Sequence, residues 1–190
     1  MVLTHSLIGV PITYFLLKNK TNLWKDRLNL NILFLIGIVG SVFPDFDLTL
    51  SFFVHDLNHR KLISHSIVPY LILFSTVYFF SCTLKKNQML IKQANLIFFV
   101  TVLSHLLLDY IVGGISLFAP FSINIYGFDI YFEKSSDFFY KYFTSWYMVA
   151  EMILMSISMY FIYKLKEIKI NLFLPFFFLV IALLMVYKYL

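Results

Sequence analysis

The sequence is poor in charged residues and in cysteine. Charged residues make up 13% of the 190 positions and hydrophobic ones 61%, whereas a typical soluble domain has about 25% charged and roughly 45–50% apolar residues. A soluble domain of this length cannot bury so much apolar surface, and a disordered chain is marked by low hydrophobicity. The single cysteine, Cys82, allows no disulfide within the chain. Because a soluble domain and a disordered chain are both excluded, we predict an integral membrane protein that forms one domain, residues 1–190.

Long apolar runs predict helices that span a bilayer, since a crossing takes about 20 residues. A marginal run opens the chain from Leu3 to Leu17. The other runs are 28–47, 62–84, 95–119, 145–163 and 170–189. We therefore predict an all-α fold, a polytopic transmembrane helical bundle of about five to six helices. Its motif-bearing core is residues 4–122, followed by C-terminal helices at 145–163 and 170–189.

The basic residues indicate how the bundle is oriented. They outnumber the acidic ones by 15 to 10, but they do not form the stripe that binds nucleic acid, so we expect no nucleic-acid partner. Most lie in loops expected on one side: Lys18, Lys20, Lys25, Arg27, Lys85, Lys86, Lys92, Lys164, Lys166 and Lys169. The positive-inside rule makes that side cytoplasmic. The loops 48–61 and 120–144 are then extracytoplasmic.

Histidine and aspartate residues converge on the opposite, outer side. They end or begin the predicted spans there, or lie in an outer loop: His5, Asp45, Asp47, His55, His59, His65, His105 and Asp109. Separate chain segments thus bring His and Asp to one depth of the membrane. Ionisable residues within spans are functional by default, although they can also pair structurally with one another. A metal ion would offset the cost of burying several carboxylates together.

The spacings favour a shared ion. His105 and Asp109 are four residues apart, so both project from one face of a helix. Pro44 predicts a break in the preceding helix, and in an extended turn Asp45 and Asp47 would point the same way.

Arginine and glycine residues add two further signals. His59 and His65 flank Arg60, whose guanidinium suits a phosphate or carboxylate through paired hydrogen bonds. Gly113 and Gly114 allow a sharp turn after the helix that carries Asp109.

Four motifs in this order resemble a known family. They are THS near the start, PDFD, HRKLISHS and SHLLLDYIVGGISLFAPF, and together they extend over residues 4–122. The set resembles the membrane-bound metal-dependent hydrolases, also described as YdjM-like, LexA-binding inner-membrane-associated hydrolases. The resemblance implies a bacterial inner-membrane protein whose polar site residues are His5, Asp45, Asp47, His59, Arg60, His65, His105 and Asp109.

These observations lead to a hypothesis with assigned roles. A metal-activated water attacks an ester or phosphoester of a lipid or lipid-linked substrate at the outer membrane face. Zinc is the first choice of ion, with manganese or iron as alternatives. The expected ligands are His5, Asp45, His65, His105 and Asp109. Asp47 is a bridging ligand, an outer-shell partner or the general base, and Arg60 with His59 binds the anionic part of the substrate.

The alternative is a membrane protein without hydrolytic activity. The same groups suit a metal- or proton-linked transporter or a metal-stabilised scaffold. Transporters often show inverted repeats and broken helices near the midplane, and the sequence shows no repeat. An open coordination position beside a substrate cleft would favour hydrolysis, whereas a closed site would favour the scaffold.

Overall fold

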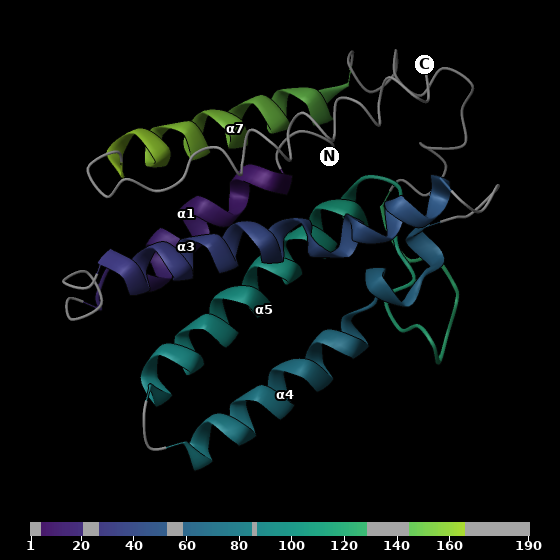
Figure 1. Ribbon diagram of the computed structural model, residues 1–190. Coiled ribbons are helices and arrows are strands. Elements are labelled where there is room, and N and C mark those ends of the chain that lie inside the picture. Colours follow the sequence, from purple (N-terminus) through teal and green to yellow (C-terminus); the bar gives the residue numbers. More distant parts are fainter. Residues whose placement is uncertain (1–4, 21–26, 53–58, 85–86, 129–144, 166–190) are drawn as a thin grey trace.

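The computed structural model describes residues 5–20, 27–52, 59–84, 87–128 and 145–165, and every regular element within these ranges is helical. The α-helices are α1 (His5–Leu17), α3 (Arg27–Val42), α4 (Ile67–Thr83), α5 (Gln88–Ile111) and α7 (Trp146–Lys164) (Figure 1). Three short 3-10 helices lie between α3 and α4: η1 (Phe43–Phe52), η2 (His59–Lys61) and η3 (Ile63–His65). The predicted all-α membrane bundle is confirmed for this part of the chain.

Three helical segments are long and apolar enough to cross a membrane. They are Leu28–Asp47, Gln88–Ile111 and Trp146–Lys164, while Leu7–Leu17 and Ile67–Thr83 are apolar but shorter. The five correspond to expected runs: Leu28–Asp47 has the expected ends, and the ends of the other four differ. The helix expected at 170–189 lies outside the described residues.

Helix α5 differs from the run expected at 95–119. It begins earlier, at Gln88, and ends at Ile111. Gly113 and Gly114 follow with φ values of +103° and +80°, in the left-handed region that other residues rarely adopt. The turn expected at these glycines is therefore present, and the apolar sequence beyond it is not helical.

Helix α4 begins later than expected. It begins at Ile67 rather than near residue 62, because Ser66 adopts an extended conformation and its Oγ accepts a hydrogen bond from Val68 N at 3.2 Å. Such a cap satisfies one of the free N–H groups of the first turn. His65, expected to open this helix, lies instead in the 3-10 turn before it.

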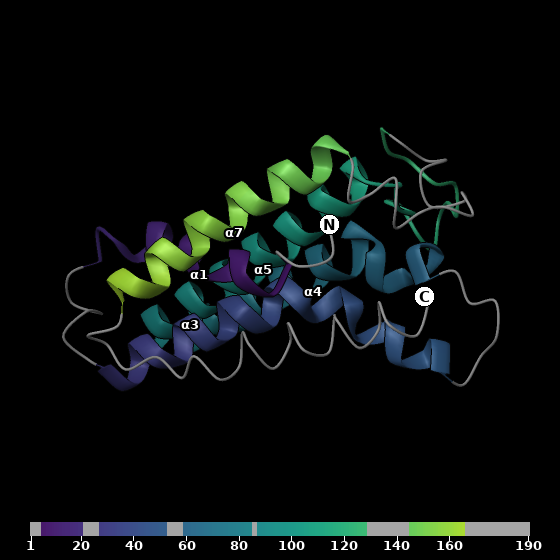
Figure 2. The same cartoon turned by 90° about the horizontal axis from the view of Figure 1, so that it is seen from above.

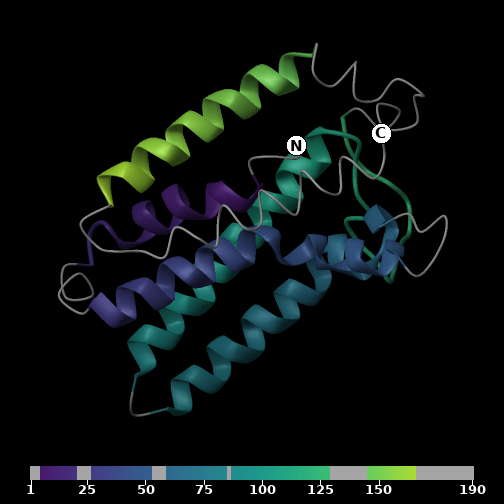
Figure 3. The same cartoon turned by 45° about the horizontal axis from the view of Figure 1, so that its top comes forward.

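Helix α3 occupies the centre of the bundle. It contacts α1 on one side and α5 on the other, while α7 packs on α1 and α4 packs on α5. Figures 1 and 3 show α7 at one edge and α4 at the other, and Figure 2 gives the view from above. Fully buried residues of α1, α3 and α5, such as Val10, Phe34 and Ile97, form the core between them.

Two glycines let α1 and α3 approach closely. A Cβ atom at Gly9 would overlap the carbonyl group of Gly37, and a Cβ atom at Gly37 would overlap Thr13 Oγ1. Small residues at a crossing are the usual means by which helices approach within a membrane. The contact fixes the start of α1, which carries His5, against the helix that leads to Asp45.

Helices α4 and α5 form an antiparallel pair. The amide Nδ2 of Asn95 donates to the carbonyl of Phe74 at 2.9 Å, and the rings of Phe74 and Phe99 stack at 4.6 Å. Counting back along α4 from Phe74 places its first residue, Ile67, close to the level of Ser104 on α5. The last turns of α5 therefore extend past α4 and lie beside η3.

Candidate metal centre

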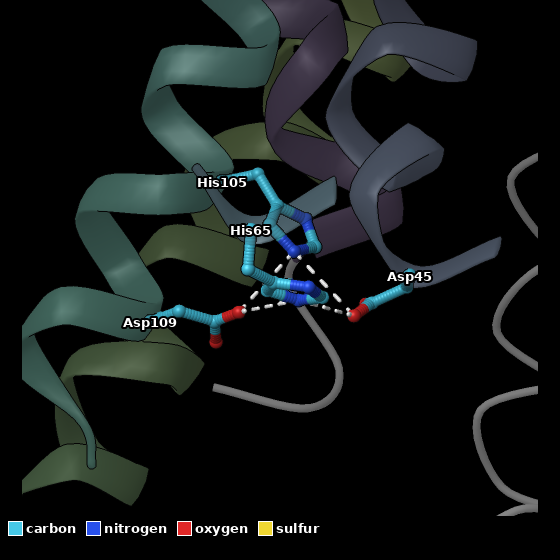
Figure 4. Close-up of side chains that lie close together, drawn as sticks. All are labelled: Asp45, His65, His105 and Asp109. Carbon is cyan, nitrogen blue, oxygen red and sulfur yellow. Dashed lines mark ion pairs between the residues drawn. The ribbon is translucent and has the colours of Figure 1, made fainter. Parts of the chain in front are cut away.

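Four side chains gather at the end of the bundle where η3 meets α5. Asp45 comes from η1, His65 from η3, and His105 and Asp109 from α5. One potential ligand atom of each lies within 4.8 Å of those of the other three. Figure 4 shows the two imidazole rings between the two carboxylates. We call these four residues the His–Asp cluster.

The four distances between histidine and aspartate atoms in the His–Asp cluster are nearly equal. His65 Nε2 lies 3.5 Å from Asp45 Oδ1 and 3.4 Å from Asp109 Oδ2. His105 Nε2 lies 3.5 Å and 3.3 Å from the same two oxygens. Ligands about 2.0–2.1 Å from a tetrahedral zinc ion would be about 3.4 Å apart. The four His–Asp distances thus match those between the ligands of one such ion, and the remaining two pairs of ligand atoms lie within 4.8 Å.

The second nitrogen of each histidine is held by a hydrogen bond. His105 Nδ1 donates to the carbonyl oxygen of Ser41 at 2.8 Å, and His65 Nδ1 donates to Asp47 Oδ2 at 3.1 Å. Asp47 also accepts a hydrogen bond from Ser64 Oγ. Ligand histidines in metal sites are oriented in this way, with Nδ1–H on a carbonyl or carboxylate and Nε2 left for the metal.

One nitrogen of the His–Asp cluster indicates that the residues fit an ion. His105 Nε2 is buried and makes no hydrogen bond with the described residues, although two carboxylate oxygens lie near it. A buried polar atom without a hydrogen bond is costly. A cation bound between this nitrogen and the carboxylates would satisfy it.

The electrostatics of His65 point the same way. Burial lowers its pKa, but hydrogen bonding to the carboxylates of Asp109, Asp45 and Asp47 outweighs burial and holds the pKa well above its usual value. The surroundings of the ring therefore favour positive charge. A divalent cation would compete with the proton for Nε2, as it does at other histidine sites.

His5 lies beside the His–Asp cluster rather than within it. Its Nε2 is 3.4 Å from Asp109 Oδ1, the oxygen that does not face the other histidines, and its ring packs edge-on against that of His105 at 4.2 Å. The residue is buried. Its position also suits an outer partner of Asp109, and the ligand role expected for His5 stays a prediction.

Arg60 occupies the space at the end of α5. Its Nη1 donates to the carbonyl groups of Asp109, Val112 and Gly114 at 3.2, 2.5 and 3.3 Å, and its Nη2 lies 3.6 Å from Asp109 Oδ1. The last carbonyl groups of a helix have no partner within it, so the buried guanidinium caps α5. It also holds Asp109 with Oδ2 towards the histidines. These contacts involve Nη1 and one side of Nη2, and the anion-binding role expected for Arg60 stays a prediction.

Asp45 and Asp47 reach His65 by a different geometry from the one expected. The segment after Pro44 is a 3-10 helix, not an extended turn, although α3 does end just before it as predicted. Three residues per turn place side chains two positions apart about 120° from each other. Asp45 consequently contacts Nε2 of His65 and Asp47 contacts Nδ1.

The His–Asp cluster is least buried at Asp45. The side chain of Asp45 is 29% exposed, whereas those of His65, His105 and Asp109 are at most 7% exposed. Phe43 and Phe46, on either side of Asp45 in the chain, are 41% and 47% exposed. Asp45 is thus the member of the cluster that reaches the surface, and its neighbours Phe43 and Phe46 are exposed there as well.

Two residues that contact the site, Ser64 and Ser41, could not be identified from the sequence. Ser64 lies within the HRKLISHS motif, but nothing in its residue type singles it out as a partner of Asp47. Ser41 contributes a backbone carbonyl, which no sequence pattern indicates. The backbone of His59 lies in η2, but the structure does not describe its side chain.

Comparison with known proteins yields one match. The family model described as YdjM inner membrane protein matches residues 1–189. No curated protein and no solved structure matches the chain. The match extends well beyond the motifs of residues 4–122 and includes the part expected to form the C-terminal helices. The chain therefore belongs to the YdjM inner membrane protein family.

Proposed function

We propose that this protein is a metal-dependent hydrolase of the inner membrane whose ion is held by Asp45, His65, His105 and Asp109. The four His–Asp distances of 3.3–3.5 Å between their ligand atoms carry the proposal. An ion bound there lowers the pKa of a coordinated water towards about 7 and supplies a nucleophile at neutral pH. An ester or phosphoester is the substrate class that this chemistry suits.

The number of coordination positions matters for this proposal. Four protein ligands complete a tetrahedral zinc site, and closed sites of that kind are structural. A fifth position on zinc, or the six positions of manganese or iron, would leave room for water. The partly exposed side at Asp45 is where that water would enter. A metal-stabilised scaffold is the second candidate function, because the four ligands can also close the site.

The residues of the chain have separate tasks in the proposed reaction. Asp47 holds the His65 ring with Nε2 towards the ion, and the Ser41 carbonyl does the same for His105. Arg60 keeps Asp109 in its ligand orientation. These contacts fix the ligands before substrate arrives, which lowers the cost of organising the site during the reaction.

The surroundings of Asp45 favour a lipid or lipid-linked substrate. Exposed rings of Phe43 and Phe46 border the accessible side of the His–Asp cluster. In a membrane protein such rings contact acyl chains or sit at the level of the headgroups. A lipid could keep its chains among them while its headgroup ester reaches the ion.

Turnover by the metal-loaded protein tests the proposal. The purified protein would be stripped with a chelator, restored separately with Zn²⁺, Mn²⁺ or Fe²⁺, and supplied with vesicles of phospholipid or of a lipid-linked phosphate. At least one ion should restore release of the hydrolysed headgroup. Asp45→Asn should abolish it, because the amide keeps the shape of the carboxylate but lacks its charge.

Lys61→Met provides the matched control for this assay, since Lys61 is exposed and adjacent to the site. It should leave turnover unchanged. If each ion raises thermal stability and no substrate is hydrolysed, the scaffold is the correct function and the hydrolase proposal fails.

We also propose that the His–Asp cluster faces the extracytoplasmic side, as the distribution of lysine and arginine indicates. An alkaline phosphatase fused after Lys85 should then be inactive, because the fusion point is cytoplasmic. The same enzyme fused after Asp56 should be active and serves as the matched control. An active fusion at Lys85 would reverse the orientation.

A further inference from the structure

The segment from Ile115 to Phe128 combines an ordered backbone with an apolar exterior. We call it the apolar loop. It follows the turn at Gly113 and Gly114, is not helical, and contains no charged residue. Figure 1 shows it beside the short 3-10 helices, at the end of the bundle that holds the His–Asp cluster. Connecting segments of proteins are ordinarily polar and face water, so this composition needs an explanation.

Hydrogen bonds within the apolar loop close its backbone. Ile115 and Tyr126 exchange a pair of backbone hydrogen bonds, both at 2.9 Å, and the tip is closed by Phe121 N donating to Phe118 O at 2.9 Å. At its end, Phe128 N donates to the carbonyl of Tyr110 in α5 at 3.1 Å. These bonds satisfy part of the loop backbone, and backbone groups satisfied by the protein favour placing a non-helical segment in an apolar surrounding.

Further contacts fix the apolar loop to the site segments. Ser116 N donates to the carbonyl of Arg60 at 2.9 Å, and Ser66 Oγ donates to the carbonyls of Leu117 and Ala119 at 3.0 and 2.7 Å. Ser66 directly follows the cluster residue His65. The loop and the His–Asp cluster are thus parts of one rigid arrangement.

Ile115 and Ala119 of the loop are buried, whereas other apolar side chains of the loop point outward. Phe121 is 84% exposed, Phe128 80% and Ile123 66%. The loop begins just after α5, a helix of 24 residues that is about 36 Å long and exceeds the roughly 30 Å hydrocarbon core of a bilayer. A helix of this length is long enough for its end to reach the headgroup layer. At this level of the membrane, the side chains that point outward from the loop would contact lipid.

We propose that the apolar loop inserts its tip, at Phe121 and Ile123, into the boundary between headgroups and acyl chains of the leaflet beside the His–Asp cluster. Burial of large apolar side chains in this boundary drives interfacial binding of protein segments. Insertion would hold the accessible side of the cluster at headgroup depth. The proposal stands on the loop itself and does not depend on hydrolase activity.

Depth measurements on labelled protein test this proposal. Phe121→Cys in a Cys82→Ser background would carry an environment-sensitive fluorophore, with the protein reconstituted in vesicles of phosphatidylethanolamine and phosphatidylglycerol. We expect several-fold weaker quenching by aqueous iodide than for a label at Lys20→Cys, which lies in an exposed position after α1. A nitroxide near the lipid headgroup should quench the Phe121 label more than one near the end of the acyl chain.

Two further labels complete the experiment. Ile153→Cys, at an exposed position in the middle of α7, should show the opposite depth preference. Ile123→Cys should repeat the result of Phe121→Cys and guards against a fault in one variant. Strong iodide quenching at both loop positions would place the tip in water and overturn the proposal. Protection from iodide without quenching by either lipid would mean that protein, such as a second copy of the chain, covers the loop, and would also overturn it.

Discussion

Replacing His105 with alanine is expected to remove the metal ion from the purified protein, whereas the same change at His5 should leave most of it bound. His105 Nε2 faces both carboxylates of the His–Asp cluster, while His5 contacts only the outer oxygen of Asp109 among the cluster's carboxylates. Loss of an outer partner typically weakens metal binding by about 10–100-fold, and loss of a ligand should exceed that range. Metal content by mass spectrometry and competition with a chelator would measure both variants.

The comparison separates the ligand set predicted from the sequence from the one that the geometry favours. Equal loss of metal in His5→Ala and His105→Ala would restore His5 as a ligand. A parent protein that binds no ion at all, although folded, would leave the His–Asp cluster as a network of paired charges. Both proteins should be compared at the same detergent concentration and after identical exposure to chelator.

Arg60→Met is expected to destabilise the protein and to weaken metal binding together. Methionine fills part of the volume but leaves Asp109 without its cation and the end of α5 without its cap. Breaking a buried ion pair by removing one partner typically costs about 3–5 kcal/mol. We expect a large fall in the thermal unfolding temperature of the metal-free protein and a still larger fall in the presence of zinc, because the variant also binds the ion more weakly and gains less stability from it.

Lys61→Met is the control for this prediction, as it removes the neighbouring positive charge from an exposed position. Its stability and metal affinity should equal those of the parent. If Arg60→Met instead keeps both properties and raises only the KM for an anionic substrate, Arg60 binds substrate as the sequence suggested, and the contacts at the end of α5 are dispensable.

The helical bundle could be predicted from hydropathy because each apolar run has to cover about the thickness of a bilayer. The ends of the helices could not be predicted in this way. Hydropathy continues past Ile111 without a break, while the backbone turns at two glycines. Similarly, residues 62–66 are apolar enough to extend α4, but Ser66 caps it and the preceding residues form 3-10 turns.

The gathering of histidine and aspartate could be predicted because helix ends on one side of a membrane share one depth. The i, i+4 spacing also correctly placed His105 and Asp109 on one face of α5, where Nε2 and Oδ2 lie 3.3 Å apart. Which oxygen or nitrogen each side chain presents depends on contacts across the bundle. The sequence therefore could not distinguish His5, at the outer oxygen of Asp109, from the residues that face the centre of the cluster.

The short length of α4, whose first turn lies below the last turns of α5, makes the site sensitive to bilayer thickness. Helix α4 has 17 residues and is about 26 Å long, less than the roughly 30 Å of an average hydrocarbon core, and His65 lies just before its first turn. Lipids with longer acyl chains would submerge this end of α4 further, while shorter chains would raise it towards the headgroups. Tilting or local thinning of the bilayer offsets such a mismatch at a modest cost per ångström. The acyl-chain length of the surrounding lipids thus sets how far a headgroup must descend to reach Asp45.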